Sequence, residues 1–144
     1  IFQKGKMKIG VFGVGIKLQG LVPEPLFGNT RYLDPIQKAN EISTHLKQEE
    51  KCDLVICLSH LGYNYSGEKP SDHTLATQSE NIDIILGGHT HTFLDKPTEI
   101  LNKKNHPVII NQAGWGGVIL GRLDLIWTRG KTARKPHNTM LKLS

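Results

Sequence analysis

The stretch IDIILGGHTHT, residues 82–92, decides the fold class. Its first five residues form a near-continuous apolar run, which is typical of a strand buried on both faces of a sheet. A second run of this type spans residues 52–58 and ends at Ser59-His60. Strands of this kind occur where helices cover both sides of a parallel sheet. The sequence therefore predicts an α/β fold.

Helix signals precede both runs. Asp34-Pro35 is a typical helix start, because Asp caps the first turn and Pro fits the first helical position. A shorter helix is predicted from Ser71 to about Ser79. The first helix has one apolar face, formed by residues that recur at spacings of three to four: Ile36, Ala39, Ile42 and Leu46.

The two ends of the chain favour strands. Residues 7–16 combine β-branched residues with glycines and predict a strand beside a tight turn. Residues 107–112 and 118–126 are separated by a glycine-rich segment, and they predict a β-hairpin or two strands of a sheet. Residues 21–32 contain two prolines and a Gly-Asn pair, which predict an irregular segment.

Length and composition are those of one globular domain. The chain has 144 residues, of which 38% are hydrophobic and 22% are charged, so a disordered or fibrous chain is excluded. No uncharged apolar run approaches the ~20 residues that span a bilayer, so no membrane span is predicted. Cys52 and Cys57 are too far apart along an extended chain to bridge each other, and we expect them to be free, buried thiols.

The net charge of +5 is concentrated at one end of the chain. Residues 129–144 contain five basic residues and no acidic one, so residues 1–128 carry no net charge. We therefore expect one domain over residues 1–128 and a basic tail over residues 129–144 that can include a last strand. A short basic tail is more often solvated than bound to nucleic acid, so nucleic acid is not the expected partner.

Three histidines follow the two buried runs. His60 comes two residues after Leu58, and His89 and His91 follow the glycine pair that comes after the run at residues 82–86. Ligands of parallel sheets bind beyond the carboxyl ends of neighbouring strands, so these three imidazoles are expected in one cleft. If the chain is extended there, the spacing of two residues points His89 and His91 to the same side.

Neutral imidazole is a common ligand of Zn, Mn and Fe. The candidate metal ligands are therefore His60, His89 and His91, and three imidazoles are enough to hold one ion. The other histidines are expected to be surface groups: His45, His73, His106 and His137. Residues 111–117 either lie near the cleft or form a packing turn, and their glycines favour the turn.

Four segments together resemble the second half of a calcineurin-like metallophosphoesterase domain, from about Lys8 to Ile126. The most similar branch is that of the bacterial 5′-nucleotidases and 2′,3′-cyclic phosphodiesterases. The segments are Leu58–Gly62, Ile82–His91, Asn111–Gly114 and Gly121–Asp124. The resemblance implies part of a β-sandwich with flanking helices, that is, half of an α-β-β-α layered domain.

The resemblance also implies a chemistry. Two divalent ions, Zn, Mn or Fe, clamp the phosphate of a nucleotide or another phosphoester in that family. His60 and His89 would bind one ion and His91 the other. The resemblance makes an exported or periplasmic protein plausible, without deciding where the protein is located.

The sequence also departs from the family pattern. The family's Asp-x-His, Gly-Asp and Gly-Asn-His motifs are missing, and Gly28-Asn29-Thr30 lacks the histidine and lies too close to His60. We therefore expect the carboxyl-terminal part of a domain that lacks its first half, with apolar surface left uncovered. Two nearby cations need anionic ligands to offset their repulsion, so at most one ion, weakly held, and negligible hydrolysis are expected.

Three other classes of protein compete with this interpretation. A metallo-β-lactamase-like site requires Asp and His where Phe93 and Leu94 stand. An amidohydrolase barrel requires more strands after its His-x-His than the chain has left. A non-catalytic α/β module, which binds a partner through the Trp115 loop or the basic tail, or binds a single metal ion, stays open.

Overall fold

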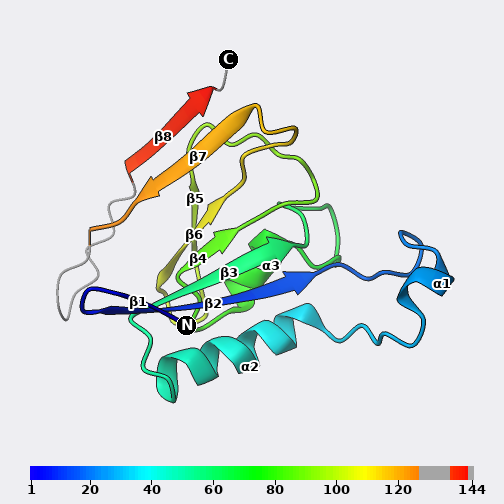
Figure 1. Cartoon of the computed structure of the whole chain (residues 1–144), viewed down its shortest axis with the longest axis horizontal. Coiled ribbons are helices and arrows are strands. Elements are labelled where there is room, and N and C mark those ends of the chain that lie inside the picture. The colour runs from blue at the N-terminus through cyan, green and yellow to red at the C-terminus, as the bar shows by residue number, and fades with distance from the viewer. Residues whose placement is uncertain (127–136, 143–144) are drawn as a thin grey trace.

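The computed structural model describes residues 1–126 and the strand at residues 137–142. It contains two sheets and three helices in the described part of the chain (Figure 1). The elements, in chain order, are β1 (Phe2–Lys4), β2 (Met7–Gly15), α1 (Glu24–Phe27), α2 (Pro35–Gln48), β3 (Leu54–His60), α3 (Asp72–Gln78), β4 (Ile84–Leu86), β5 (Thr98–Leu101), β6 (Pro107–Asn111), β7 (Ile119–Asp124) and β8 (His137–Lys142).

The larger sheet has the strand order β1-β2-β3-β4-β6-β5. Its four inner strands run parallel, and the two edge strands, β1 and β5, pair antiparallel with their neighbours. The second sheet is the antiparallel pair β7-β8. The predicted α/β class with parallel inner strands is confirmed, and β8 lies within residues 129–144.

Residues 107–112 and 118–126 do not form a hairpin with each other. β6 has β4 on one side and β5 on the other, so both of its edges are occupied. β7 therefore pairs elsewhere, with β8. Of the two possibilities left open by the sequence, two separate strands is the correct one.

Helices α2 and α3 cover one face of the larger sheet and form the main core with it. The side chain of Asp34 accepts a hydrogen bond from the backbone N–H of Gln37 and caps α2, as predicted. The predicted apolar face of α2 is wrong at Ile42, which is 38% exposed. Ser43 is buried instead, and its hydroxyl donates to the carbonyl of Asn40, so that its polar group is satisfied inside the core.

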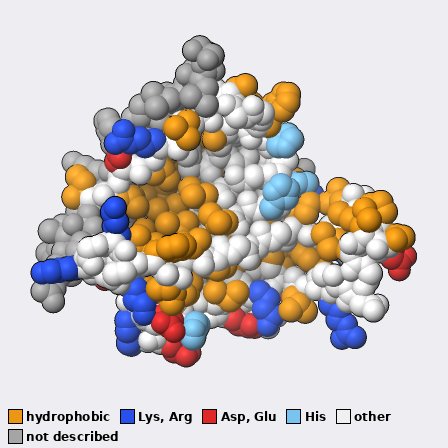
Figure 2. All heavy atoms as spheres, in the orientation of Figure 1, with side chains coloured by type: hydrophobic (Ala, Val, Ile, Leu, Met, Phe, Trp, Pro, Cys, Tyr) orange, Lys and Arg blue, Asp and Glu red, His pale blue; other side chains and the backbone are white. Residues whose placement is uncertain are grey.

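The opposite face of the sheet carries a second apolar cluster built on Leu54, Ile84 and Ile109. Leu123 and Leu125 pack against part of this cluster. Figure 2 shows this face, where hydrophobic side chains form a continuous patch and histidine side chains lie beyond it, towards the carboxyl ends of β2 and β3. The face thus stays partly open, as expected for a partial sandwich.

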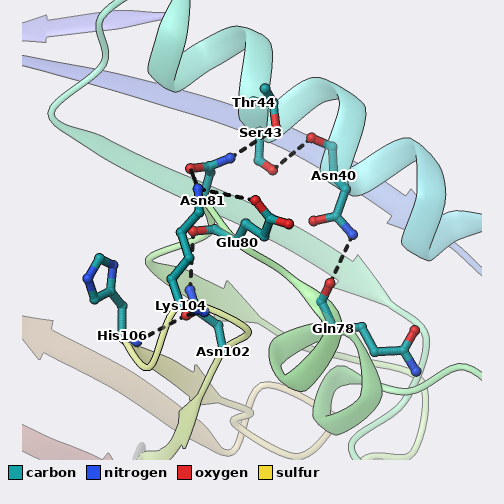
Figure 3. Close-up of polar contacts among 9 residues, drawn as sticks. All are labelled: Asn40, Ser43, Thr44, Gln78, Glu80, Asn81, Asn102, Lys104 and His106. Carbon is teal, nitrogen blue, oxygen red and sulfur yellow. Dashed lines mark hydrogen bonds and ion pairs between the residues drawn. The ribbon is translucent and has the colours of Figure 1, made fainter.

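A polar network ties the turn between β5 and β6 to the helices (Figure 3). The buried side chain of Asn102 accepts hydrogen bonds from the backbone N–H groups of Lys104 and His106, and it donates one to the carbonyl of Glu80. Nearby, the amide of Asn40 donates to the carbonyl of Gln78 and joins α2 to α3. This network lies at the amino end of β6.

Cys52 and Cys57 are both buried and free, which confirms the expectation from their spacing. Burial, reinforced by the negative charge of Asp72, raises the pKa of the Cys57 thiol to about 12. In the described part of the chain no helix combines the length and the apolar character that crossing a membrane requires.

Candidate metal site

Two of the three predicted histidines come together at the carboxyl ends of neighbouring parallel strands. His60 is the last residue of β3, and His89 lies in the loop after β4, which pairs with β3. Their ring centroids are 5.2 Å apart and their planes are inclined by 62°. The sequence therefore correctly predicted that these two strand ends meet.

The ring of His91 has a different partner, Trp115. The backbone φ angles of His89 and His91 are 75° and 53°, which are left-handed rather than extended conformations. The condition under which their side chains would share one side is therefore not met. The His91 ring instead stacks on Trp115, with centroids 6.2 Å apart and planes inclined by 23°.

The described residues contain no group of three or more His, Cys, Asp or Glu side chains that could hold a metal ion. A single position shared by all three imidazoles is thus not formed in the described structure. His60 and His89 form a histidine pair, and the His91 ring stacks on Trp115.

The environment of the pair favours uncharged imidazole at His89. Burial lowers the pKa of His89, and electrostatic interactions with His60, Lys69 and His91 lower it further. Lys69 is held close by, with its Nζ 4.1 Å from the centroid of the Tyr65 ring. Neutral imidazole is the form that binds a metal ion.

A buried carboxylate lies beneath the loop that carries His89. Asp72, in the first turn of α3, is fully buried, and its Oδ2 accepts a hydrogen bond from Nε2 of Gln112 at 3.2 Å. Desolvation raises the pKa of Asp72 to about 6, although hydrogen bonds from Ser59 and Gln112 oppose the shift. Asp72 belongs to the interior under the loop rather than to the histidine pair.

Residues 111–117 do more than form a packing turn. Residues 112–114 run alongside residues 92–94, with a β-bridge between Phe93 and Ala113. The sequence missed Gln112, whose side chain contacts the histidine loop directly. Its place just after a third buried strand, at the same sheet edge as both histidine loops, was the available signal.

The other predicted surface histidines divide into two groups. His45 is exposed on α2 beside Glu49, and His106 is exposed in the turn before β6. His73 is not a surface group: its Nε2 is buried, and its ring packs against Tyr63 at 4.5 Å. The interpretation of His73 as a surface group was therefore wrong in part, since the residue as a whole is half-buried. The side chain of His137 lies outside the described residues.

Residues 28–30 form a turn. The backbone N–H of Gly28 donates to the carbonyl of Glu24, and that of Thr30 donates to the carbonyl of Phe27. These two bonds end α1 and close the turn that follows it.

The comparisons with known proteins agree with this architecture. The family model of the calcineurin-like phosphoesterases matches residues 12–93. This match covers more than half of the chain, including both histidine loops. The chain belongs to the calcineurin-like phosphoesterase family.

Similar curated proteins are named as nucleotide-hydrolysing enzymes. An apyrase from Tabanus yao is 34% identical over 140 residues, and the match covers 87% of this chain and 24% of that protein. A 5′-nucleotidase from Vibrio cholerae is 30% identical, with 96% and 28% covered. The trifunctional nucleotide phosphoesterase protein YfkN of Bacillus subtilis is 34% identical, with 82% and 8% covered. The chain spans about a quarter or less of the length of these relatives.

Solved structures share the fold. The 5′-nucleotidase precursor from Thermus thermophilus superimposes with a TM-score of 0.76 at 23% identity, and the match covers 96% of this chain and 28% of that one. The NAD nucleotidase of Haemophilus influenzae gives a TM-score of 0.73 at 20% identity, with 96% and 30% covered. At these identities the likeness concerns the fold alone.

Proposed function

We propose that the chain is part of a metal-dependent phosphoester hydrolase that acts on nucleotides, in the manner of a 5′-nucleotidase. The observation that carries the proposal is the pairing of His60 with His89 at the edge of a parallel sheet, in a chain of this family. The names of the relatives support a nucleotide as the substrate.

The histidine pair suits one divalent ion. Two imidazoles that bind one ion at nitrogen–metal distances of about 2.1 Å place their ring centroids roughly 5 Å apart. The observed separation of 5.2 Å fits this arrangement. In the proposed site His60 and His89 hold one ion, and His91, whose ring stacks on Trp115, belongs to a second position.

A divalent ion lowers the pKa of bound water and polarises a phosphoryl oxygen, which are the two requirements of phosphoester hydrolysis. The described residues supply two imidazoles for one ion. Among these residues, no carboxylate lies with the two imidazoles in a group that could hold a metal ion. Two ions close together would repel each other without such a charge. We therefore propose that these 144 residues bind at most one ion, weakly, and hydrolyse nucleotides negligibly.

Calorimetric titration with Zn²⁺ and with Mn²⁺ tests this proposal. The wild-type chain is expected to bind up to one equivalent, and His60→Ala and His89→Ala are each expected to abolish this binding. His106→Ala is the control, because His106 is exposed at the amino end of β6. A wild-type chain that binds neither metal would refute the site and favour the non-catalytic module. Hydrolysis of a nucleoside monophosphate at the rate of a complete nucleotidase would refute the one-ion limit.

An exported or periplasmic location of the whole protein is a further part of this proposal, and it rests on the family resemblance. Immunoblots of periplasmic and cytosolic fractions test it, and finding the protein only in the cytosol would contradict it.

A further inference from the structure

Gln112 is a buried amide with four hydrogen bonds around one loop. The residue is 2% exposed and follows directly after β6. Its Nε2 donates to the carbonyl of Gly88 at 3.0 Å and to Oδ2 of Asp72 at 3.2 Å. Its Oε1 accepts from the backbone N–H of Thr92 at 2.8 Å and from the Thr90 hydroxyl at 3.3 Å. One side chain thus connects both ends of residues 88–92.

The loop that it spans has an unfavourable backbone conformation. His89 and His91 both have positive φ angles, which side chains other than glycine rarely adopt. Such conformations persist only where the surrounding structure enforces them. Within the loop the backbone N–H of Thr90 donates to the carbonyl of Gly88, and the hydroxyls of Thr90 and Thr92 share a hydrogen bond. From outside, the Gln112 side chain makes three hydrogen bonds to the loop, and the backbone N–H groups of Tyr63 and Gly114 make one each.

Asp72 fixes which way the amide of Gln112 points. A carboxylate oxygen accepts hydrogen bonds, so the nitrogen of the amide, not its oxygen, faces Asp72 and the carbonyl of Gly88. The oxygen is then directed at the N–H of Thr92. The loop presents a carbonyl oxygen at Gly88, which needs a donor, and a backbone N–H at Thr92, which needs an acceptor. Only this orientation of the amide satisfies both groups.

We propose that Gln112 is a positioning residue of the metal site: by holding residues 88–92 at both ends, it directs the His89 imidazole towards His60. This inference rests on the function proposed above. Residues that orient metal ligands without touching the metal typically alter metal affinity about 10- to 100-fold when changed.

Gln112→Met is the test variant, because methionine keeps the length of the side chain and lacks all the hydrogen bonds. The matched control is Asn102→Ala, which removes another buried amide with three hydrogen bonds in the turn between β5 and β6 (Figure 3). Both variants are expected to lower the melting temperature. Only Gln112→Met is expected to weaken Zn²⁺ or Mn²⁺ binding, by about 10-fold or more, measured by calorimetry well below both melting temperatures.

A second measurement does not depend on metal. NMR spectra of the metal-free chain are expected to show shifted or broadened signals from the amides of residues 88–92 and from the His89 ring in Gln112→Met. Asn102→Ala should leave them unchanged. Unchanged loop signals in Gln112→Met, or metal affinity equal to that of the wild type, would overturn the inference. If the wild type binds no metal, the proposed function fails, and the NMR comparison alone then decides whether Gln112 positions the loop.

Discussion

The carboxylate of Asp72 lies directly against the α-carbon of Gly87. A Cβ atom at residue 87 would stand 2.0 Å from Oδ2 of Asp72 and 2.9 Å from Nε2 of Gln112. Gly87 has no positive φ angle, so space and not backbone conformation requires glycine there. Gly87, the first of the two glycines before His89, thus makes room for the buried Asp72–Gln112 contact.

We expect Gly87→Ala to destabilise the fold by about 1–3 kcal/mol, because the added methyl group must push Asp72 or Gln112 aside. Urea denaturation of both proteins measures the difference. Gly15→Ala is the control, since a Cβ atom at residue 15 would have no other atom within 4 Å and the φ angle there is not positive. Equal effects of the two substitutions would contradict the steric explanation.

The raised pKa of Asp72, about 6, makes stability depend on pH. The folded state holds the proton more tightly than the unfolded state, whose Asp pKa is about 3.9, so this group lowers stability as the pH rises from about 4 to about 6. Asp72→Asn removes the charge and keeps an oxygen that can accept from Gln112. We expect this variant to match the wild type near pH 4 and to exceed its stability by up to roughly 3 kcal/mol above pH 7.

Urea denaturation of both proteins at several pH values from about 4 to about 8 checks the Asp72 prediction. The difference between the two should grow with pH and then level off. A difference that is constant, or that shrinks as the pH rises, would show that the charge of Asp72 is not the cause.

Lys47 and Asp83 form an ion pair that joins α2 to the sheet. Nζ of Lys47 lies 2.8 Å from Oδ2 of the nearly buried Asp83, which also accepts from the backbone N–H of Val55. Lys47→Met removes the cation from a buried carboxylate, and we expect a loss of about 3 kcal/mol in the free energy of unfolding.

Lys38→Met is the control for this ion pair. Lys38 pairs with Glu41 on the exposed side of α2, and exposed pairs contribute about 0–1 kcal/mol. Both losses are measured by urea denaturation at neutral pH. Similar losses in the two variants would refute the assigned importance of the Lys47–Asp83 pair.

Neither cysteine should react with Ellman's reagent in the native chain at neutral pH. Both thiols are buried, and the pKa of Cys57 is raised to about 12, so the reactive thiolate is scarce. In denaturant both should react within minutes. Fast labelling of the native chain would mean that β3 opens readily.

The sequence predicted those elements whose patterns are local. The apolar runs of β3 and β4, and the Asp34 and Ser71 caps of the two longer helices, could be read from neighbouring residues. β5 was missed because it is an edge strand with alternating exposed residues, defined by its pairing with β6. The same limit applies to Ile42 and Ser43, since packing against the sheet decides which one is buried.

The candidate site was predictable only in part. That His60 and His89 meet follows from adjacent parallel strands, which the sequence indicates. The place of His91 depends on two left-handed residues, and the role of Gln112 depends on hydrogen bonds between distant segments. Neither the placement of His91 nor the role of Gln112 produces a periodic pattern of residues from which it could be predicted.

The order of pairing in the larger sheet also governs how the chain folds. β2 pairs in parallel with β3, and the two helices α1 and α2 lie between them in the sequence. Contacts between such distant segments require the closure of a long loop, which slows folding relative to all-helical proteins of similar size. After dilution from denaturant, the chains therefore keep unpaired strands for longer, and these can pair with strands of other molecules. Refolding should for this reason give its best yield at low protein concentration.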